Sequence, residues 1–183
     1  MRNEPAESVL SALESILLVA PGPVPLSALV SALGLPRRDI EAALAALAAE
    51  LRRGIRLQSH AGTLRLVSAP ENAEVVRRFL GTVRPPSLSR AALEVLAVVA
   101  YDQPATRAEV EAARGLDSDR PMRTLIARGL IEEVGRRAGP GRPAEYGTTA
   151  EFLEYFGLTS LDDLPPRPEP ETATPEELGF RPQ

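Results

Sequence analysis

The feature that most constrains this chain is an internal repeat with a period of about 80 residues. The segments "LESILLVA" and "LEVLAVVA" open two stretches that carry the same signals in the same order, so that Glu14 corresponds to Glu94 and Gly34 to Gly115. Self-similarity at a fixed period indicates copies of one structural unit. Each unit has the pattern helix, helix, helix, strand, turn, strand, helix.

Local signals support the helices of this pattern. A helical apolar stripe with the spacing i, i+3, i+4, i+7 is formed by Leu93, Leu96, Ala97 and Ala100. Thr106 and Glu109 have the spacing of a capping box, in which two side chains satisfy free backbone N–H groups at a helix start. Thr148 and Glu151 repeat that spacing and predict a second capping box.

The segment "IRLQSHAGTLRLVSA" predicts a β-hairpin, because two short runs of Leu, Ile and Val surround a turn that contains Gly. Three helices followed by such a hairpin are the winged-helix pattern. The predicted fold is therefore mainly α with small β wings, an α+β chain of two tandem winged-helix domains over 1–81 and 90–164, joined by a linker over 82–89. The tail over 165–183 is rich in Pro and Glu, and we expect it to be disordered.

The composition excludes several kinds of functional site. The chain has no Cys and one His, His60, which removes disulfides, thiolate ligands and His clusters. No pair of titratable groups with separable roles is evident, since Glu132-Glu133 and Asp162-Asp163 are adjacent pairs typical of a solvated surface. We therefore expect no catalytic, cofactor-binding or metal site. No apolar run approaches the roughly 20 residues that cross a bilayer, and we expect a cytoplasmic protein.

The stretch "GRRAGPGRP", with Arg136, Arg137 and Arg142, has three possible interpretations. A phosphate-binding loop is excluded, because the stretch joins two strands and lacks the required Lys. A DNA-gripping wing would accompany a recognition helix over Ser118–Arg128, but Asp117 stands at the start of that helix, and the net charge of −4 and pI of about 5.2 disfavour a DNA reader. The remaining interpretation is a structural wing loop.

The first helix of each unit is more apolar than a single core-facing stripe requires. In the first unit the apolar positions are Val9, Leu10, Leu13, Ile16, Leu17, Leu18 and Val19. Such a helix either lies at the centre of its own domain or turns one side to a partner chain. From the second alternative we predict dimerisation through Val9, Leu13 and Ile16.

The second unit closely resembles the C-terminal half of bacterial segregation and condensation protein B. The resemblance rests on "TRAEVE..RG", "SDR...TLI.RGLIEEVGR", "PGRP..YGTT.EFL..FGL" and "SLDDLP", in this order. It implies two winged-helix domains, a homodimer formed chiefly by the N-terminal domains, and a second domain that binds the kleisin called segregation and condensation protein A, which bridges the heads of an SMC ATPase. This chain departs from the family at Glu145, where an apolar residue is common.

The resemblance further implies a nucleoid-associated adaptor without catalytic activity, which acts in chromosome condensation and segregation and meets DNA only indirectly or weakly. We expect the partner contacts to involve Tyr101, Arg107, Arg123, Arg142, Tyr146 and Phe152. The alternative that the sequence leaves open is a tandem winged-helix transcription regulator that binds DNA directly.

Overall fold

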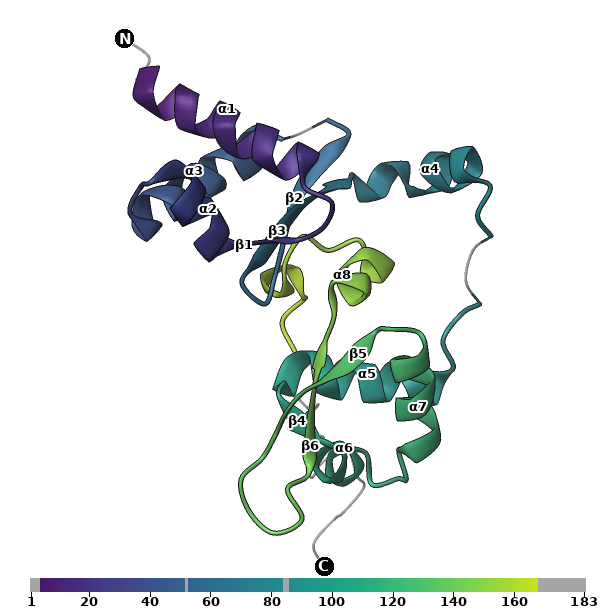
Figure 1. Ribbon diagram of the computed structural model, residues 1–183. Helices are drawn as coiled ribbons and strands as arrows, with labels where there is room; N and C mark the ends of the chain where they lie inside the picture. The colour runs from purple at the N-terminus through teal and green to yellow at the C-terminus, as the bar shows by residue number, and fades with distance from the viewer. Residues whose placement is uncertain (1–3, 52, 84–85, 168–183) are drawn as a thin grey trace, which may run out of the picture.

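The structure is a computed structural model that describes residues 4–51, 53–83 and 86–167. Its first unit has the predicted order of helices and hairpin (Figure 1). The elements are α1 (Glu4–Val19), β1 (Val24–Pro25), α2 (Leu26–Leu33), α3 (Arg37–Glu50), β2 (Ile55–His60), β3 (Thr63–Ser68), the 3-10 helix η1 (Pro70–Asn72) and α4 (Ala73–Leu80).

The second unit repeats this order. Its elements are α5 (Arg90–Asp102), β4 (Ala105–Thr106), α6 (Arg107–Arg114), α7 (Asp119–Ala127), β5 (Ile131–Arg136), β6 (Ala144–Thr148), α8 (Ala150–Phe156) and the 3-10 helix η2 (Leu161–Asp163). The predicted fold class, mainly α with small antiparallel β wings, is confirmed. Among the described residues, no helix is both long and apolar enough to cross a bilayer.

Each hairpin gains a third strand that the sequence did not indicate. The strand orders are β1-β3-β2 and β4-β6-β5, and all pairs are antiparallel. Val24 pairs with Leu64 in the first sheet, and Ala105 pairs with Tyr146 in the second. A two-residue strand is too short to carry the alternation by which strands are recognised.

The two predicted capping boxes have different outcomes. The box of Thr106 and Glu109 is present at the start of α6. The second box, predicted for Thr148 and Glu151, is wrong. Thr148 is the last residue of β6, and the N-cap of α8 is Thr149, whose hydroxyl accepts a hydrogen bond from the backbone N–H three residues on at 3.1 Å. Thr148, which the Thr–Glu spacing assigned to the cap, is instead part of the sheet.

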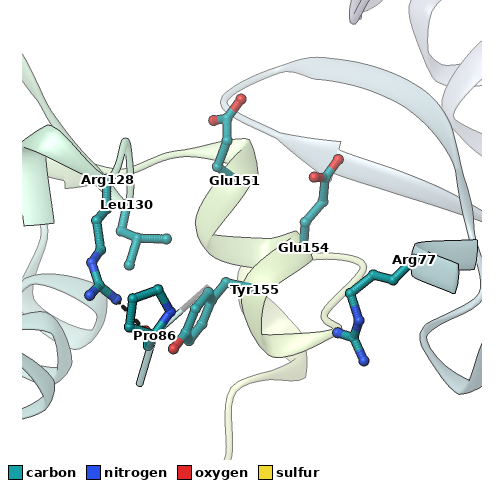
Figure 2. A pocket seen from close by; sticks show the side chains of 7 residues that line it. All are labelled: Arg77, Pro86, Arg128, Leu130, Glu151, Glu154 and Tyr155. Atoms are coloured by element: carbon teal, nitrogen blue, oxygen red, sulfur yellow. Dashed lines mark hydrogen bonds between the residues drawn. The ribbon is translucent and has the colours of Figure 1, made fainter. Parts of the chain in front are cut away.

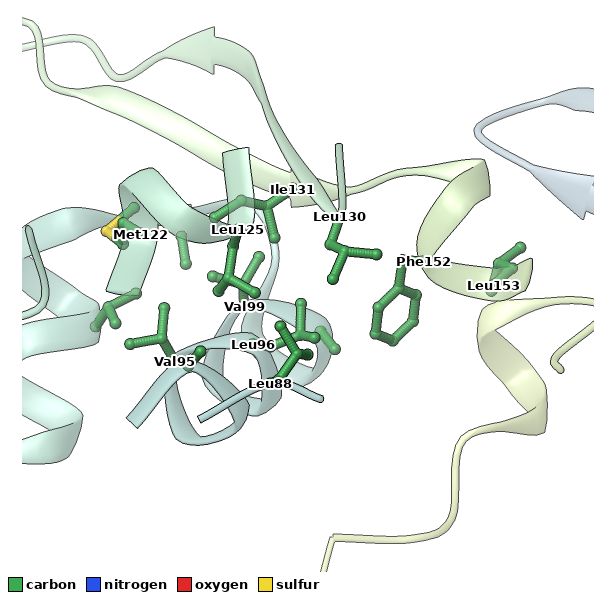
Figure 3. Close-up of a cluster of buried hydrophobic side chains, with 14 residues drawn as sticks. Leu88, Val95, Leu96, Val99, Met122, Leu125, Leu130, Ile131, Phe152 and Leu153 are labelled. Atoms are coloured by element: carbon green, nitrogen blue, oxygen red, sulfur yellow. The ribbon is translucent and has the colours of Figure 1, made fainter. Parts of the chain in front are cut away.

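Each unit has its own hydrophobic core. The first is built from Leu13, Leu17, Leu29, Ile40, Leu44, Leu47 and Leu64. The second, drawn in Figure 3, is centred on α5 and α7, with Phe152 and Leu153 of α8 at one end. Leu88, which the sequence placed in the linker, is buried in this second core. We keep 1–81 and 90–164 as proposed domains, with Leu88 packed against the second.

The segment that follows α8 lies against the wing of the first unit, and we call residues 157–167 the hook. Figure 1 shows α8 between the first sheet and α5. The Ser59 N–H donates to the carbonyl of Thr159 at 2.8 Å, and the Gln58 Nε2 donates to the carbonyl of Leu158 at 3.2 Å. Two units that are separate in sequence are therefore joined by polar contacts.

The start of the predicted disordered tail is ordered. The Tyr101 hydroxyl donates to the carbonyl of Pro165 at 2.6 Å, and Arg167 forms an ion pair with Asp102 at 2.6 Å. The prediction is therefore wrong for 165–167, since these residues find partners on α5. The rest of the tail, 168–183, lies outside the described residues.

Candidate functional site

The main candidate site is an apolar groove between α5 and the segment from α8 to the hook, and we call it the α5 groove. Its volume is about 400 Å³. It is lined by Leu93, Leu96, Ala97, Ala100, Tyr101, Phe152, Phe156, Leu158, Leu164 and Pro165. Apart from the tyrosine hydroxyl, these side chains carry no polar atom, so the groove suits an apolar guest.

The groove exists because α5 is apolar on two sides. Val95 and Val99 are fully buried and face the core of the second unit. The stripe that predicted the helix also lines the groove, where Leu93 is 43% exposed and Ala97 is exposed. A helix that only covered its own core would need one such face. The excess apolar character of α5 is thus a surface feature, not core packing alone.

Two aromatic residues of α8 form the opposite side of the groove. Phe152 is 2% exposed and belongs to the core, whereas Phe156 is 43% exposed. Their ring centroids are 5.0 Å apart with a tilt of 51°. At the rim, Tyr101 binds Pro165 through its hydroxyl, and the Arg167 guanidinium lies 5.4 Å from the centroid of the Tyr101 ring. Tyr101 therefore ties the hook to α5.

The six residues predicted for partner contact do not form one site. Tyr101 and Phe152 meet at the α5 groove. Arg107 and Arg123 lie together in an ion-pair cluster around the start of α7. The remaining two, Arg142 and Tyr146, belong to the second wing. The sequence analysis did not identify Phe156, Leu158 or Leu164, although apolar residues at the end of a short helix and just beyond it are a usable signal.

The ion-pair cluster engages two arginines of the helix-turn-helix face, Arg107 and Arg123. Arg107 reaches Glu111 at 2.6 Å, Asp119 at 2.6 Å and Asp117 at 2.9 Å. Asp119 also forms an ion pair with Arg123. The hydrogen bond with Glu111 raises the pKa of Arg107, and the backbone N–H of Asp119 lowers the pKa of Asp117. All three guanidinium nitrogens of Arg107 are engaged, so a phosphate group would have to displace carboxylates to reach this arginine.

A second group of ion pairs fixes the turn between α6 and α7. The Arg114 side chain is 6% exposed and binds Glu94 at 3.1 Å and the Ser118 hydroxyl at 2.8 Å. The pKa of Glu94 is lowered, first by its hydrogen bond to Arg114 and then by that to Arg90. This arginine supports the fold and is not offered to a partner.

The base of the second wing is held by Arg137. Its guanidinium donates to Glu145 at 2.7 Å and to the carbonyl of Pro104 at 3.2 Å, and it also binds Glu109. Glu145, the residue that departs from the family pattern, therefore has a local partner. Tyr146 packs on the second core, while Arg142 lies exposed in the wing loop with a positive φ of 41°.

Another pocket, of about 560 Å³, lies between α4, Pro86 and α8 (Figure 2). Its walls carry Arg77 and Arg128 together with Glu151 and Glu154. Arg77 is paired with Glu74, and Arg128 donates to the carbonyl of Pro86 at 2.7 Å. In Figure 2 the two glutamates lie next to each other between the two arginines, each of which is paired with a group other than these glutamates. Within the described ranges, no group of three or more His, Cys, Asp or Glu side chains could hold a metal ion.

The residues predicted for dimerisation lie mostly inside the first unit. Leu13 is fully buried in its own core, a position that serves the packing of that domain, and Val9 and Ile16 pack half-buried against the core. The exposed apolar surface of this unit lies elsewhere. It includes Leu18, Val19, Val75, Phe79 and Leu80, of which Phe79 is 88% exposed.

Comparison with known proteins gives consistent matches over most of the chain. The family described as "Segregation and condensation complex subunit ScpB" matches residues 11–167. The segregation and condensation protein B of Moorella thermoacetica is 46% identical over 166 residues, which cover 88% of this chain and 84% of that protein. The protein of the same name from Geobacillus thermodenitrificans is 45% identical over 90% of this chain and 79% of its own length.

Solved structures are also similar. ScpB from Mycobacterium tuberculosis is 43% identical, with 84% of this chain and 98% of that chain covered and a TM-score of 0.40. A dimer of an ScpB N-terminal domain complexed with an ScpA peptide is 22% identical over 41% of this chain and 98% of that chain, also with a TM-score of 0.40. The family match and the identity to the Moorella and Geobacillus proteins decide the assignment: this chain belongs to the family of segregation and condensation complex subunit ScpB.

Proposed function

We propose that this chain is a non-enzymatic adaptor of the bacterial SMC–kleisin complex, which acts at the nucleoid in chromosome condensation and segregation. As a homodimer it binds the kleisin, segregation and condensation protein A. Family membership supports the process. The α5 groove supports the mode of action, and it is the observation on which the proposal mainly rests.

The α5 groove fits a helical segment of a partner chain. Amphipathic helices bind by laying their apolar face into a hydrophobic groove, with anchor residues spaced i, i+3, i+4, i+7. The groove presents a row of small and medium side chains on α5, including Ala97 and Ala100, against the larger Phe156 on α8. A row of small residues leaves room for such anchors. The kleisin segment expected here is therefore a helix with one apolar face.

The charges disfavour the two other functional classes. A DNA reader needs a basic face, but Arg107 and Arg123 are paired with carboxylates, and the net charge of the chain is −4. An enzyme needs titratable groups with separable roles around one cavity. The α5 groove has apolar walls, and in the pocket beside Arg77 the two arginines are paired with Glu74 and with the carbonyl of Pro86.

The exposed apolar surface of the first domain supports the dimer. Val75 and Phe79 are one helical turn apart on α4, and both are exposed. Apolar patches of this kind mark protein interfaces.

The kleisin contact is tested by placing a charge in the groove of the full-length chain. Ala97→Glu puts a carboxylate on the exposed floor of the groove, where burial under a partner costs several kcal/mol without a pairing charge. We expect an affinity for full-length segregation and condensation protein A at least about tenfold weaker, measured by isothermal titration calorimetry. Ala112→Glu, on the exposed side of α6, is the matched control and should bind normally. Equal affinities would contradict the groove as the kleisin site.

The dimer is tested by light scattering of the full-length chain. Phe79→Glu should reduce the dimer mass to that of a monomer, because the charge would be buried at the interface. Leu116→Glu alters an apolar residue of the second domain that is exposed to a similar degree as Leu80, and it should leave the dimer intact. A wild-type monomer at tens of micromolar would refute the homodimer.

A further inference from the structure

We propose that the hook couples the α5 groove to the first domain. Docking of the hook on the first wing fixes one wall of the groove, and a guest in the groove in turn stabilises the docked hook. The inference deepens the proposed function, since it takes the kleisin as the guest. Its structural part, the link between hook and groove, is tested separately below.

Leu158 belongs to both sites at once. Its side chain lines the α5 groove, while its carbonyl accepts a hydrogen bond from Gln58 of the first wing at 3.2 Å. The next residue, Thr159, accepts from the Ser59 N–H at 2.8 Å. Leu158 therefore cannot move away from α5 without changing these two hydrogen bonds.

The first wing presents a prepared receptor for the hook. Gln58 is 2% exposed, and both ends of its amide are used, because its Oε1 accepts from the Arg65 Nε at 2.7 Å. Arg65 also contacts Glu154 of α8, with 2.6 Å between its Nη2 and the carboxylate. A buried amide that loses its partner carries the full desolvation penalty of that group. Partial undocking is therefore disfavoured, and the contact behaves as closed or open.

The hook is itself rigid between its two attachments. Asp163 accepts hydrogen bonds from the Thr159 N–H at 2.7 Å, from the Thr159 hydroxyl at 2.6 Å and from the Ser160 N–H at 3.1 Å. The hydrogen bond from the hydroxyl lowers the pKa of this carboxyl. Beyond it, Pro165 is held by Tyr101 on α5. The hook therefore moves as one piece, and a displacement at the first wing reaches the groove.

The sign of the coupling follows from preorganisation. With the hook docked, Leu158 and Leu164 are already in place when a guest arrives. With the hook open, the guest must first order that wall, and this ordering weakens binding. Coupling between two sites typically changes an affinity about 5- to 150-fold, and we expect docking and kleisin binding to strengthen each other about tenfold. The factor must be equal in both directions.

A single glycine allows a controlled test of the docking. Gly157 has φ +69°, and a Cβ placed there would lie 2.9 Å from the Cβ of Pro70 in the first domain. Gly157→Ala should therefore push the hook off the wing. Gly115→Ala is the matched control, because Gly115 also ends a helix, has φ +66° and has no atom within 4 Å of the added Cβ. Pro70→Gly combined with Gly157→Ala removes the clash and should restore docking.

The readout is native-state hydrogen exchange of the Ser59 amide, whose N–H is bonded to the hook. In the full-length chain we expect Gly157→Ala to lower its protection about tenfold or more, with Gly115→Ala unchanged and the double variant restored. Titration with full-length segregation and condensation protein A should raise the protection of Ser59 in the wild type. Gly157→Ala should bind the kleisin about tenfold more weakly than Gly115→Ala does.

The outcomes separate the two proposals. If the kleisin binds and Gly157→Ala binds as well as Gly115→Ala, the coupling is refuted and the proposed function stands. If the wild type binds no kleisin, the proposed function fails. The coupling is then tested with Ala97→Trp, whose indole fills the groove in place of a bound partner. Ser59 protection must then rise in Ala97→Trp relative to Ala112→Trp, and unchanged protection overturns the coupling.

Discussion

Truncation of two phenylalanines one helical turn apart on α8 should affect different properties of the protein. Phe152 is 2% exposed and packs in the second core, while Phe156 is 43% exposed and faces the α5 groove. We predict that Phe152→Ala mainly costs stability and that Phe156→Ala mainly costs kleisin affinity. The two variants together test whether the groove is a binding surface beside the core or an incompletely packed part of the core itself.

The magnitudes follow from burial. Removal of a fully buried Phe side chain costs about 3–5 kcal/mol, because transfer and cavity terms add. Phe156 retains much of its contact with water in the native state, so its loss should cost about 1 kcal/mol. For a domain of this size each kcal/mol lowers Tm by about 4–8 °C, which gives at least about 12 °C for Phe152→Ala and at most about 8 °C for Phe156→Ala.

The chain offers a convenient probe for this measurement. It has no Trp, and its three tyrosines, Tyr101, Tyr146 and Tyr155, all lie in the second domain. Near-ultraviolet circular dichroism of tyrosine therefore reports the unfolding of that domain within the full-length protein. Equal Tm shifts for the two variants would refute the division between core and groove, as would unchanged kleisin affinity in Phe156→Ala.

Three further predictions concern the second domain. The backbone N–H of Thr106, followed by Arg137, lowers the pKa of Glu109 from 4.5 to about 2. The ionised Glu109 carboxylate therefore stabilises the fold above pH 4.5, and this stabilisation is lost as the pH falls toward 2. In urea unfolding, the free energies of unfolding of the wild type and of Glu109→Gln should converge over that range. Thr149→Ala removes the N-cap of α8 and should lower the free energy of unfolding by about 1 kcal/mol, measured by tyrosine-monitored urea unfolding. Arg136→Ala with Arg137→Ala should leave a weak DNA affinity and its salt dependence unchanged in fluorescence anisotropy, and a clear loss would favour a DNA-binding wing.

The order of elements was predictable because it depends on local signals that the repeat shows twice. The capping box at Thr106 and the hairpin around the first wing are each specified within a few residues, and both are present. The second cap was misplaced by one residue, since sheet register decided between two adjacent threonines. Local patterns predict that an element exists better than they predict its end.

Only the α5 side of the groove could be predicted from the sequence. The excess apolar character of α5 indicated a second face, and the structure shows where that face points. The opposite wall was not predictable, because it depends on docking between residues far apart in the chain. Gln58 and Leu158 are separated by 100 positions, and neither residue is unusual in its own segment. The ordered start of the tail has the same cause, since Arg167 finds Asp102 only after the chain has folded back.

The hook also covers an edge of the first sheet, where β2 is the outer strand of the order β1-β3-β2. An uncovered edge is a template for pairing with another strand, and proteins generally protect it. During synthesis β2 leaves the ribosome about 100 residues before its cover is made. At about 5–20 residues per second this leaves the edge bare for roughly 5–20 s. During this interval the exposed β2 edges of two nascent chains, made by neighbouring ribosomes on one mRNA, can pair with each other. This pairing competes with folding.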